Sequence, residues 1–268
     1  MISKNLQGQT AIVSGGGRGI GKAAAELLAS LGATVVLTAR SKEQIERVAA
    51  DLCQQGATAI AVAGDVADPK QVEKIVEATL NEFKRVDILI NNAGVIWAVQ
   101  EVIKTGVDEW AYNIQVNLLG SFYFTRYVLP LMVEQQYGRI VNVSSGAAIN
   151  PILGASAYSA SKAGMDIFTR SLAQELTDTG VVVNSLHPGM VDTEMQVDLR
   201  SVDTSNSRFT LTRFHDAYSE GRLRSPQDVA RAVTWLAGPW CQGQTGQIFS
   251  VANEEWIQQV NADLDQLA

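Results

Sequence analysis

A short apolar strand, a glycine-rich turn and a helix follow one another near the start of this chain, and this order restricts the fold more than any other feature. Residues 11–13 lead into Ser14-Gly15-Gly16-Gly17-Arg18-Gly19-Ile20-Gly21, and a helical pattern continues from Lys22. Glycines permit a tight turn and let a pyrophosphate approach the backbone. The N–H groups and positive dipole end of the helix favour the same anion. We therefore expect a dinucleotide to bind at this turn.

Strand-like and helix-like segments then alternate along the chain. The pattern predicts seven strands, near residues 10–13, 34–38, 58–63, 88–90, 139–143, 181–186 and 247–251. It predicts helices near residues 20–31, 42–54, 69–83, 108–134, 157–177 and 226–237. This alternation is typical of an α/β fold with helices on both faces of a parallel sheet. Right-handed crossovers make such a sheet doubly wound, with its ligand at the carboxyl ends of the strands.

One segment interrupts this rhythm. Residues 194–222 have no strand period and are rich in Ser, Thr, Asp and Arg. An irregular segment of this length is usually functional or disordered. No linker, repeat or change of composition divides the rest, and 268 residues suit one large α/β domain. We therefore expect residues 1–268 to form a single dinucleotide-binding domain.

Charge and cysteine content exclude several classes of function. The formal net charge is −7, and no basic stripe or polybasic run appears, which argues against nucleic-acid and membrane partners. The first eight residues lack the apolar core of a signal peptide, and no apolar stretch reaches membrane-spanning length. The two cysteines, Cys53 and Cys241, form no metal motif or disulfide framework. These features predict a cytoplasmic protein without a metal site.

Tyr158 and Lys162 carry the chemistry that the sequence predicts. They are four residues apart in a helical pattern, so both side chains lie on one face. A nearby ammonium favours the phenolate and lowers the pKa of a tyrosine. A tyrosine tuned in this way exchanges a proton with a carbonyl or alcohol oxygen. Ser145, thirteen residues earlier at a strand end, can donate to the same oxygen. Ser144 is a rival for this role by proximity.

Taken together, these motifs resemble the short-chain dehydrogenase/reductase family, in its main single-domain group. Ser14 stands where the family's glycine motif begins with threonine. The family's Asn-Asn-Ala-Gly is matched by residues 91–94, its helix asparagine by Asn117, and its Pro-Gly-x-Val-x-Thr by residues 188–193. The matches occur in family order between about residue 8 and residue 251. One departure follows the last strand, where the usual Val-Asp-Gly-Gly is replaced by Val251-Ala252-Asn253-Glu254, so we expect a different C-terminal course.

The resemblance implies a role for each matched residue. Tyr158 is the proton donor, Ser145 holds the substrate oxygen, Lys162 tunes Tyr158 and binds the nicotinamide ribose, and Asn117 supports a proton relay through its backbone carbonyl. The implied cofactor-binding residues are Ser14, Gly15, Gly17, Arg18, Gly19, Ile20, Gly21, Arg40, Asp65, Val66, Asn91, Ala93, Gly94, Tyr158, Lys162, Pro188, Gly189, Val191 and Thr193. Residues 194–222 correspond to the family's substrate-binding lid.

Cofactor choice depends on the end of the second predicted strand. An acidic residue about 20 positions beyond the glycines would bind the ribose hydroxyls of NAD. Here the strand ends in Ala39-Arg40 without a carboxylate, and guanidinium suits a 2′-phosphate. Arg18 resembles the second basic residue of NADP-preferring members. Solvated surface arginines are the alternative. We expect NADP(H) rather than NAD(H).

The sequence therefore predicts an NADPH-dependent oxidoreductase that reduces a ketone or aldehyde to an alcohol, reversibly, with a 3-oxoacyl thioester as one candidate substrate. The alternative is a non-catalytic NADP(H)-binding regulatory or scaffold protein. Small residues on the Tyr158 helix favour a homodimer or homotetramer, although they equally suit close packing within one chain. His187 is expected to be structural. His215, Arg208 and Arg213 in the lid can meet a polar or anionic substrate or be solvated, and Trp97 can line the pocket or lie in the core.

Overall fold

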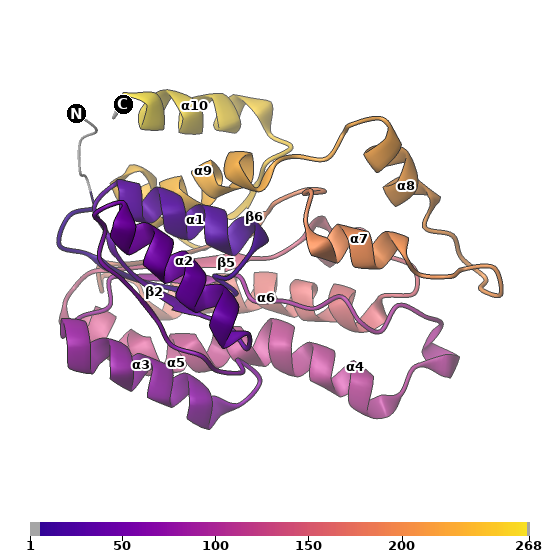
Figure 1. Ribbon diagram of the computed structural model, residues 1–268, viewed down its shortest axis with the longest axis horizontal. Helices are drawn as coiled ribbons and strands as arrows, with labels where there is room; N and C mark the ends of the chain where they lie inside the picture. Colours follow the sequence, from indigo (N-terminus) through magenta and orange to yellow (C-terminus); the bar gives the residue numbers. More distant parts are fainter. Residues whose placement is uncertain (1–5, 267–268) are drawn as a thin grey trace.

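A seven-stranded parallel sheet forms the centre of the protein, which we describe from a computed structural model covering residues 6–266. The strand order is β3-β2-β1-β4-β5-β6-β7. Figure 1 shows helices on both sides of this sheet. The strands are β1 Thr10–Ser14, β2 Thr34–Thr38, β3 Ala59–Ala61, β4 Ile88–Asn91, β5 Gly138–Val143, β6 Val181–His187 and β7 Ile248–Ser250. The predicted doubly wound α/β fold is confirmed, with small shifts at the strand ends.

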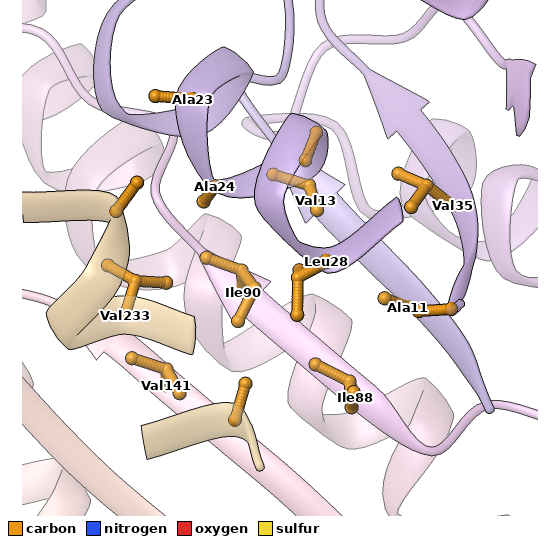
Figure 2. Packing of buried hydrophobic residues seen from close by; sticks show 14 of the residues in the cluster. Ala11, Val13, Ala23, Ala24, Leu28, Val35, Ile88, Ile90, Val141 and Val233 are labelled. Carbon is orange, nitrogen blue, oxygen red and sulfur yellow. The ribbon is translucent and has the colours of Figure 1, made fainter. Parts of the chain in front are cut away.

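Alternation along the strands sorts the core into two layers. Successive strand residues point to opposite faces of a sheet. Ile12 therefore joins a cluster with helices α3 (Pro69–Phe83), α5 (Gly120–Glu134) and α6 (Ser156–Glu175). Its neighbours Ala11 and Val13 face helices α1 (Gly19–Ser30), α2 (Lys42–Gln54) and α9 (Pro226–Ala237). Figure 2 shows this second layer, where small side chains such as Ala24 bring α1 close to the sheet.

The chain reverses its winding direction beside β1. Ile12 of β1 pairs with Val36 of β2 on one side and with Leu89 of β4 on the other. The loops after β1 and β4 therefore diverge at their carboxyl ends, and a crevice forms where strand order reverses. The fold places the glycine turn at this point.

The predicted helix over residues 108–134 is interrupted by a wider turn. Helix α4 (Val107–Ile114) passes into a π-helical turn, η2 (Gln115–Leu119), and then into α5. Single π turns of this kind occur often at functional sites. Asn117 lies in the turn and is fully buried. Periodicity alone does not reveal this insertion, because the apolar pattern continues through it.

Three helices lie in segments where the sequence predicts none. Helices α7 (Glu194–Arg200) and α8 (Thr212–Ser219) fall within residues 194–222, and α10 (Glu254–Asp265) follows β7. Figure 1 shows α7 and α8 projecting beyond the end of the sheet. Both are short and half-exposed, so neither has a long apolar stripe. Helix α10 is capped by Asn253, whose side chain accepts a hydrogen bond from the Trp256 N–H.

Helix α10 is held against α9 by polar and aromatic contacts. The Trp235 indole donates to Asp263 over 2.7 Å, and Arg231 pairs with Asp265 at 2.5 Å. Trp256 packs edge-on against Trp235. Among the described helices, none is long and apolar enough to cross a membrane. Cys53 and Cys241 are free thiols.

Candidate active site

A cavity of about 930 Å³ opens at the carboxyl ends of the strands. Its wall is built from the loops after β1 to β6 and from helices α7 and α8. The following predicted residues line it: Gly15, Gly17, Arg18, Gly19, Ile20, Arg40, Asp65, Val66, Ala93, Gly94, Ser145, Tyr158, Lys162, Pro188, Gly189, Val191 and Thr193. Residues far apart in the sequence thus share one space, as expected for this edge of a doubly wound sheet.

The glycine turn has the shape that a pyrophosphate requires. Gly15 and Gly19 have φ values of +66° and +53°, which glycine adopts without strain. A side chain at Gly21 would collide with the carbonyl oxygen of Gly15. Helix α1 begins at Gly19, and no side chain caps its first N–H groups. Uncapped N–H groups at a helix start that faces a cavity fit a bound phosphate.

Four predicted residues support the cavity from behind and do not line it. Ser14 accepts hydrogen bonds from the N–H groups of Asn92 and Ala93, each over 3.0 Å. Gly21 packs against the glycine turn. The remaining two are Asn91 and Asn117. Residues behind the wall fix the loops that form it, and the cofactor contacts predicted for Ser14, Gly21 and Asn91 stay predictions.

Hydrogen bonds of their buried side-chain amides fix the positions of Asn91 and Asn117. The Asn91 amide donates to Asn142 on β5 over 2.9 Å, tying two central strands together. The Asn117 amide donates to the Val95 carbonyl over 2.7 Å and accepts from the Val95 N–H over 2.9 Å. These bonds satisfy an otherwise costly buried amide. They also fix the loop after β4 against the π turn.

Two arginines lie at the dinucleotide end of the cavity. Arg40 donates to the hydroxyl of Tyr112 over 2.8 Å, and this hydroxyl donates to Asp65 over 3.2 Å. Arg18 forms an ion pair with Glu194 at the start of α7. The sequence analysis missed Tyr112, because it lies 72 positions from Arg40 and meets it only through the fold.

Tyr158 and Lys162 lie on one face of α6, and both are buried. Ser145 lies close enough to Tyr158 to influence the pKa of its phenol, and both residues line the cavity. The Lys162 ammonium is 5.6 Å from the centre of the Tyr158 ring and donates to the Val143 carbonyl over 2.8 Å. Ser144 instead donates to the Lys162 carbonyl over 3.2 Å. This arrangement favours Ser145 over Ser144 as the partner of Tyr158.

The protonation of Tyr158 differs from the sequence expectation. Burial raises the pKa of Tyr158 above its ordinary value, and the hydrogen bond with Ser145 only partly opposes this shift. The expected lowering by Lys162 is therefore wrong for this structure. The ammonium lies beside the ring and is bonded to Val143, so the loss of water around the phenol dominates. Burial also lowers the pKa of Lys162, to about 8, against the opposing charge of Asp166.

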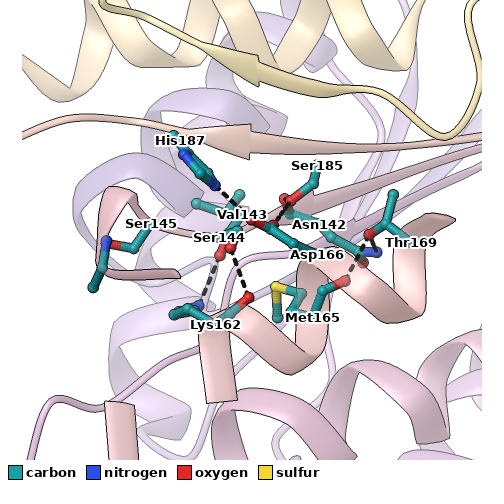
Figure 3. A network of polar contacts seen from close by, with 11 residues as sticks. Asn142, Val143, Ser144, Ser145, Lys162, Met165, Asp166, Thr169, Ser185 and His187 are labelled. Carbon is teal, nitrogen blue, oxygen red and sulfur yellow. Dashed lines mark hydrogen bonds and ion pairs between the residues drawn. The ribbon is translucent and has the colours of Figure 1, made fainter. Parts of the chain in front are cut away.

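Behind Lys162 lies a buried polar network that the sequence analysis did not identify (Figure 3). Asp166 is one helical turn after Lys162 and accepts a hydrogen bond from Ser185 over 2.7 Å. His187 Nε2 lies 2.8 Å from the other carboxylate oxygen. Burial opposes ionisation of Asp166, but hydrogen bonds from His187 and Ser185 outweigh it and lower its pKa. His187 thus has structural partners. The contact between Asp166 and Lys162 could have been predicted from their i,i+4 spacing on the helix.

The lid helices close the cavity with apolar side chains. Leu199 of α7 and Phe214 of α8 pack with Ile152 and Tyr158 in one cluster. Arg213 lines the cavity, whereas Arg208 and His215 do not. Trp97 is 45% exposed and lies outside the cavity wall. Within residues 6–266, no cluster of three or more His, Cys, Asp or Glu side chains could hold a metal ion.

The sheet order, glycine turn and cavity at the point of reversal define a dinucleotide-binding α/β protein. The chain belongs to the short chain dehydrogenase family, whose model matches residues 9–203. This is a family of oxidoreductases that bind a nicotinamide cofactor.

Similar proteins come from several bacteria. A 3-oxoacyl-[acyl-carrier-protein] reductase from Synechocystis is 36% identical over 92% of this chain and 96% of its own length. A Vibrio cholerae protein of the same description is 36% identical over 92% and 97%. The crystal structure of levodione reductase matches with a TM-score of 0.84 and 28% identity, over 92% of this chain and 96% of that one. A protein assigned as an NAD(P)-dependent gluconate 5-dehydrogenase from Beutenbergia cavernae, with bound NADP, matches with a TM-score of 0.82 and 33% identity, over 93% and 97%.

Proposed function

We propose that this protein is an NADPH-dependent reductase that converts a ketone or aldehyde to an alcohol, reversibly. The observation that carries the proposal is that Ser145, Tyr158 and Lys162 line the same cavity as the glycine turn, with the Lys162 ammonium close to the Tyr158 ring. A proton donor and a dinucleotide-binding surface in one space are the two parts that carbonyl reduction requires. A 3-oxoacyl thioester is one candidate substrate, in keeping with the relatives' descriptions.

The chemistry divides between the cofactor and the side chains. When NADPH is bound, it would supply the hydride that adds to the carbonyl carbon. Tyr158 gives its proton to the carbonyl oxygen, and Ser145 donates a hydrogen bond to the same oxygen. The raised pKa of Tyr158 keeps this proton in place at neutral pH. After transfer, the Lys162 ammonium stabilises the phenolate by charge. Asn117 fixes the loop after β4, and we propose its backbone carbonyl as part of the proton relay.

The direct test is turnover. Purified protein is mixed with NADPH, and then with NADH, and a panel of ketones, aldehydes and 3-oxoacyl thioesters is screened for loss of absorbance of the reduced cofactor. We expect oxidation of NADPH by at least one carbonyl class. Tight NADPH binding without turnover across the whole panel supports the non-catalytic alternative instead.

We propose that Arg40 and Arg18 select NADP(H) by pairing with the 2′-phosphate, in place of the acid that binds the ribose of NAD. A hydrogen bond to a charged group contributes about 1.5–3 kcal/mol. Arg40→Ala should therefore weaken NADPH binding about 10–100-fold and leave NADH binding nearly unchanged, as measured by fluorescence titration. Arg47→Ala is the control, because Arg47 is exposed on α2 and outside the cavity. Equal weakening of both cofactors contradicts this role.

We also propose that the chain assembles as a homodimer or homotetramer through α5 and α6. Among the small residues of α6, Gly164 is packed against Leu118 of the same chain. A better basis is the exposed apolar surface of Phe122 (43% exposed) and Ile167 (62% exposed), beside Phe168. Isolated large apolar groups are common, but a contiguous patch favours an interface.

A charge at the centre of this patch should break the assembly. Phe122→Glu is expected to shift the protein toward monomer in analytical ultracentrifugation, because a carboxylate is costly to bury without a partner. Phe122→Leu keeps an apolar contact and should retain the wild-type mass. An unchanged mass for Phe122→Glu places the interface elsewhere.

Residues 194–222 are proposed as the substrate lid. Helices α7 and α8 contribute Met195, Leu199 and Phe214 to the cavity wall. Because the lid lies over Tyr158, its movement would admit substrate and its closure would exclude water from the reacting oxygen.

A further inference from the structure

We propose that the substrate is an aliphatic oxo acid, whose carboxylate pairs with Arg213 while its carbonyl lies at Tyr158. This inference rests on the proposed reductase function and names the chemical class of its substrate. It follows from the distribution of apolar and charged side chains around the cavity.

The cavity is apolar on the substrate side of Tyr158. Ile152, Leu199 and Phe214 form one buried cluster with Tyr158, and Met190 and Met195 pack against it. All five of these side chains line the cavity. These apolar side chains favour a hydrocarbon chain next to the reacting carbonyl, although the cavity wall also contains Asn150 and Gln196.

Most of the cationic side chains that line the cavity already bind another group of the protein. Lys162 is bonded to the Val143 carbonyl, Arg40 to Tyr112, and Arg18 to Glu194. Arg213 is the exception: within residues 6–266, no carboxylate lies within ion-pair distance of its guanidinium. An unpaired guanidinium in the wall of a substrate cavity is suited to a carboxylate, which it can bind through two parallel hydrogen bonds.

Arg213 is an exposed residue that stacks on its neighbour in the sequence. Its guanidinium carbon lies 4.6 Å from the centre of the Phe214 ring, and Phe214 is buried in the apolar cluster. This stacking orients the charge at the edge of the apolar wall. A substrate that reaches from Tyr158 to Arg213 must therefore have a carbonyl, an aliphatic segment and an anionic end.

The test uses straight-chain oxo acids of increasing length and their methyl esters, with NADPH oxidation as the readout. A charged hydrogen bond of the usual strength predicts that kcat/KM of the best acid exceeds that of its ester about 10–100-fold. In Arg213→Gln this ratio should fall to near one, and Arg213→Lys should restore part of it. Arg208→Gln is the matched control, because Arg208 is in the same lid but outside the cavity wall, and it should keep the wild-type ratio.

Three results overturn the proposal. They are equal kcat/KM for acid and ester in the wild-type protein, a ratio unchanged in Arg213→Gln, and turnover of other ketones but of no oxo acid. In each of these cases the reductase function itself still stands. Absence of turnover with every carbonyl compound overturns the function and the inference together.

Discussion

Replacement of Tyr158 with phenylalanine is expected to reduce ketone turnover about 10²–10⁴-fold, the usual contribution of a positioned acid. The change removes the proposed proton donor while keeping the ring that packs in the lid cluster. Stability should therefore change little. The measurement is kcat/KM for the best carbonyl substrate, together with the NADPH dissociation constant, which we expect to stay within about threefold, less than 1 kcal/mol.

Tyr137→Phe is the matched control for this prediction. It removes a phenol hydroxyl that is bonded to Gln9, outside the cavity, and should leave turnover unchanged. If Tyr158→Phe retained most of its turnover, another group would be donating the proton. If cellular function survived the change, the non-catalytic reading would gain support.

Replacement of Lys162 with methionine should have two opposite effects. Turnover should fall at least about 10²-fold, since the phenolate left by Tyr158 loses its counter-charge. Stability at pH 7 should rise. The folded-state pKa of Lys162 is lowered from 10.5 to about 8 by burial, so burying the ammonium costs about 3 kcal/mol below pH 8. Losing the hydrogen bond to Val143 offsets about 2 kcal/mol, leaving a net gain of about 1 kcal/mol.

The sign of this effect fixes its pH dependence. Between pH 8 and 10.5 the unfolded chain binds more protons at Lys162 than the folded protein does, so wild-type stability rises with pH in this window. The advantage of Lys162→Met should therefore shrink from pH 7 to pH 10 in urea unfolding experiments. Lys74→Met, at an exposed position of α3, is the control and should show no such trend. A variant less stable than the wild type at pH 7 contradicts the assignment.

The features that could be predicted from the sequence are those determined by local patterns of residues. The strand, glycine turn and helix near the N-terminus and the i,i+4 pair of Tyr158 and Lys162 need no knowledge of the fold. Partners distant in sequence were not recoverable, such as His187 for Asp166 and Tyr112 for Arg40. The pKa of Tyr158 was predicted in the wrong direction because burial depends on the whole cavity.

The sequence does not show which motif residues form the cavity wall and which support it. Asn91 and Asn117 match the family pattern, and their amides are bonded behind the cavity. Helices α7 and α8 escaped detection because short half-exposed helices have little periodicity. A family motif therefore indicates which residues matter, whereas their distance from the ligand requires coordinates.

The end of β5 has a consequence for how this chain can vary. Three consecutive residues serve different groups: the Val143 carbonyl accepts from the Lys162 ammonium, Ser144 donates to the Lys162 carbonyl, and Ser145 lines the cavity beside Tyr158. Insertion or deletion of a single residue here would shift these groups relative to Lys162 and Tyr158 on α6. Substitutions near residues 143–145 can therefore be tolerated, but insertions and deletions there cannot. In natural or engineered variants we expect insertions and deletions only in loops such as the lid.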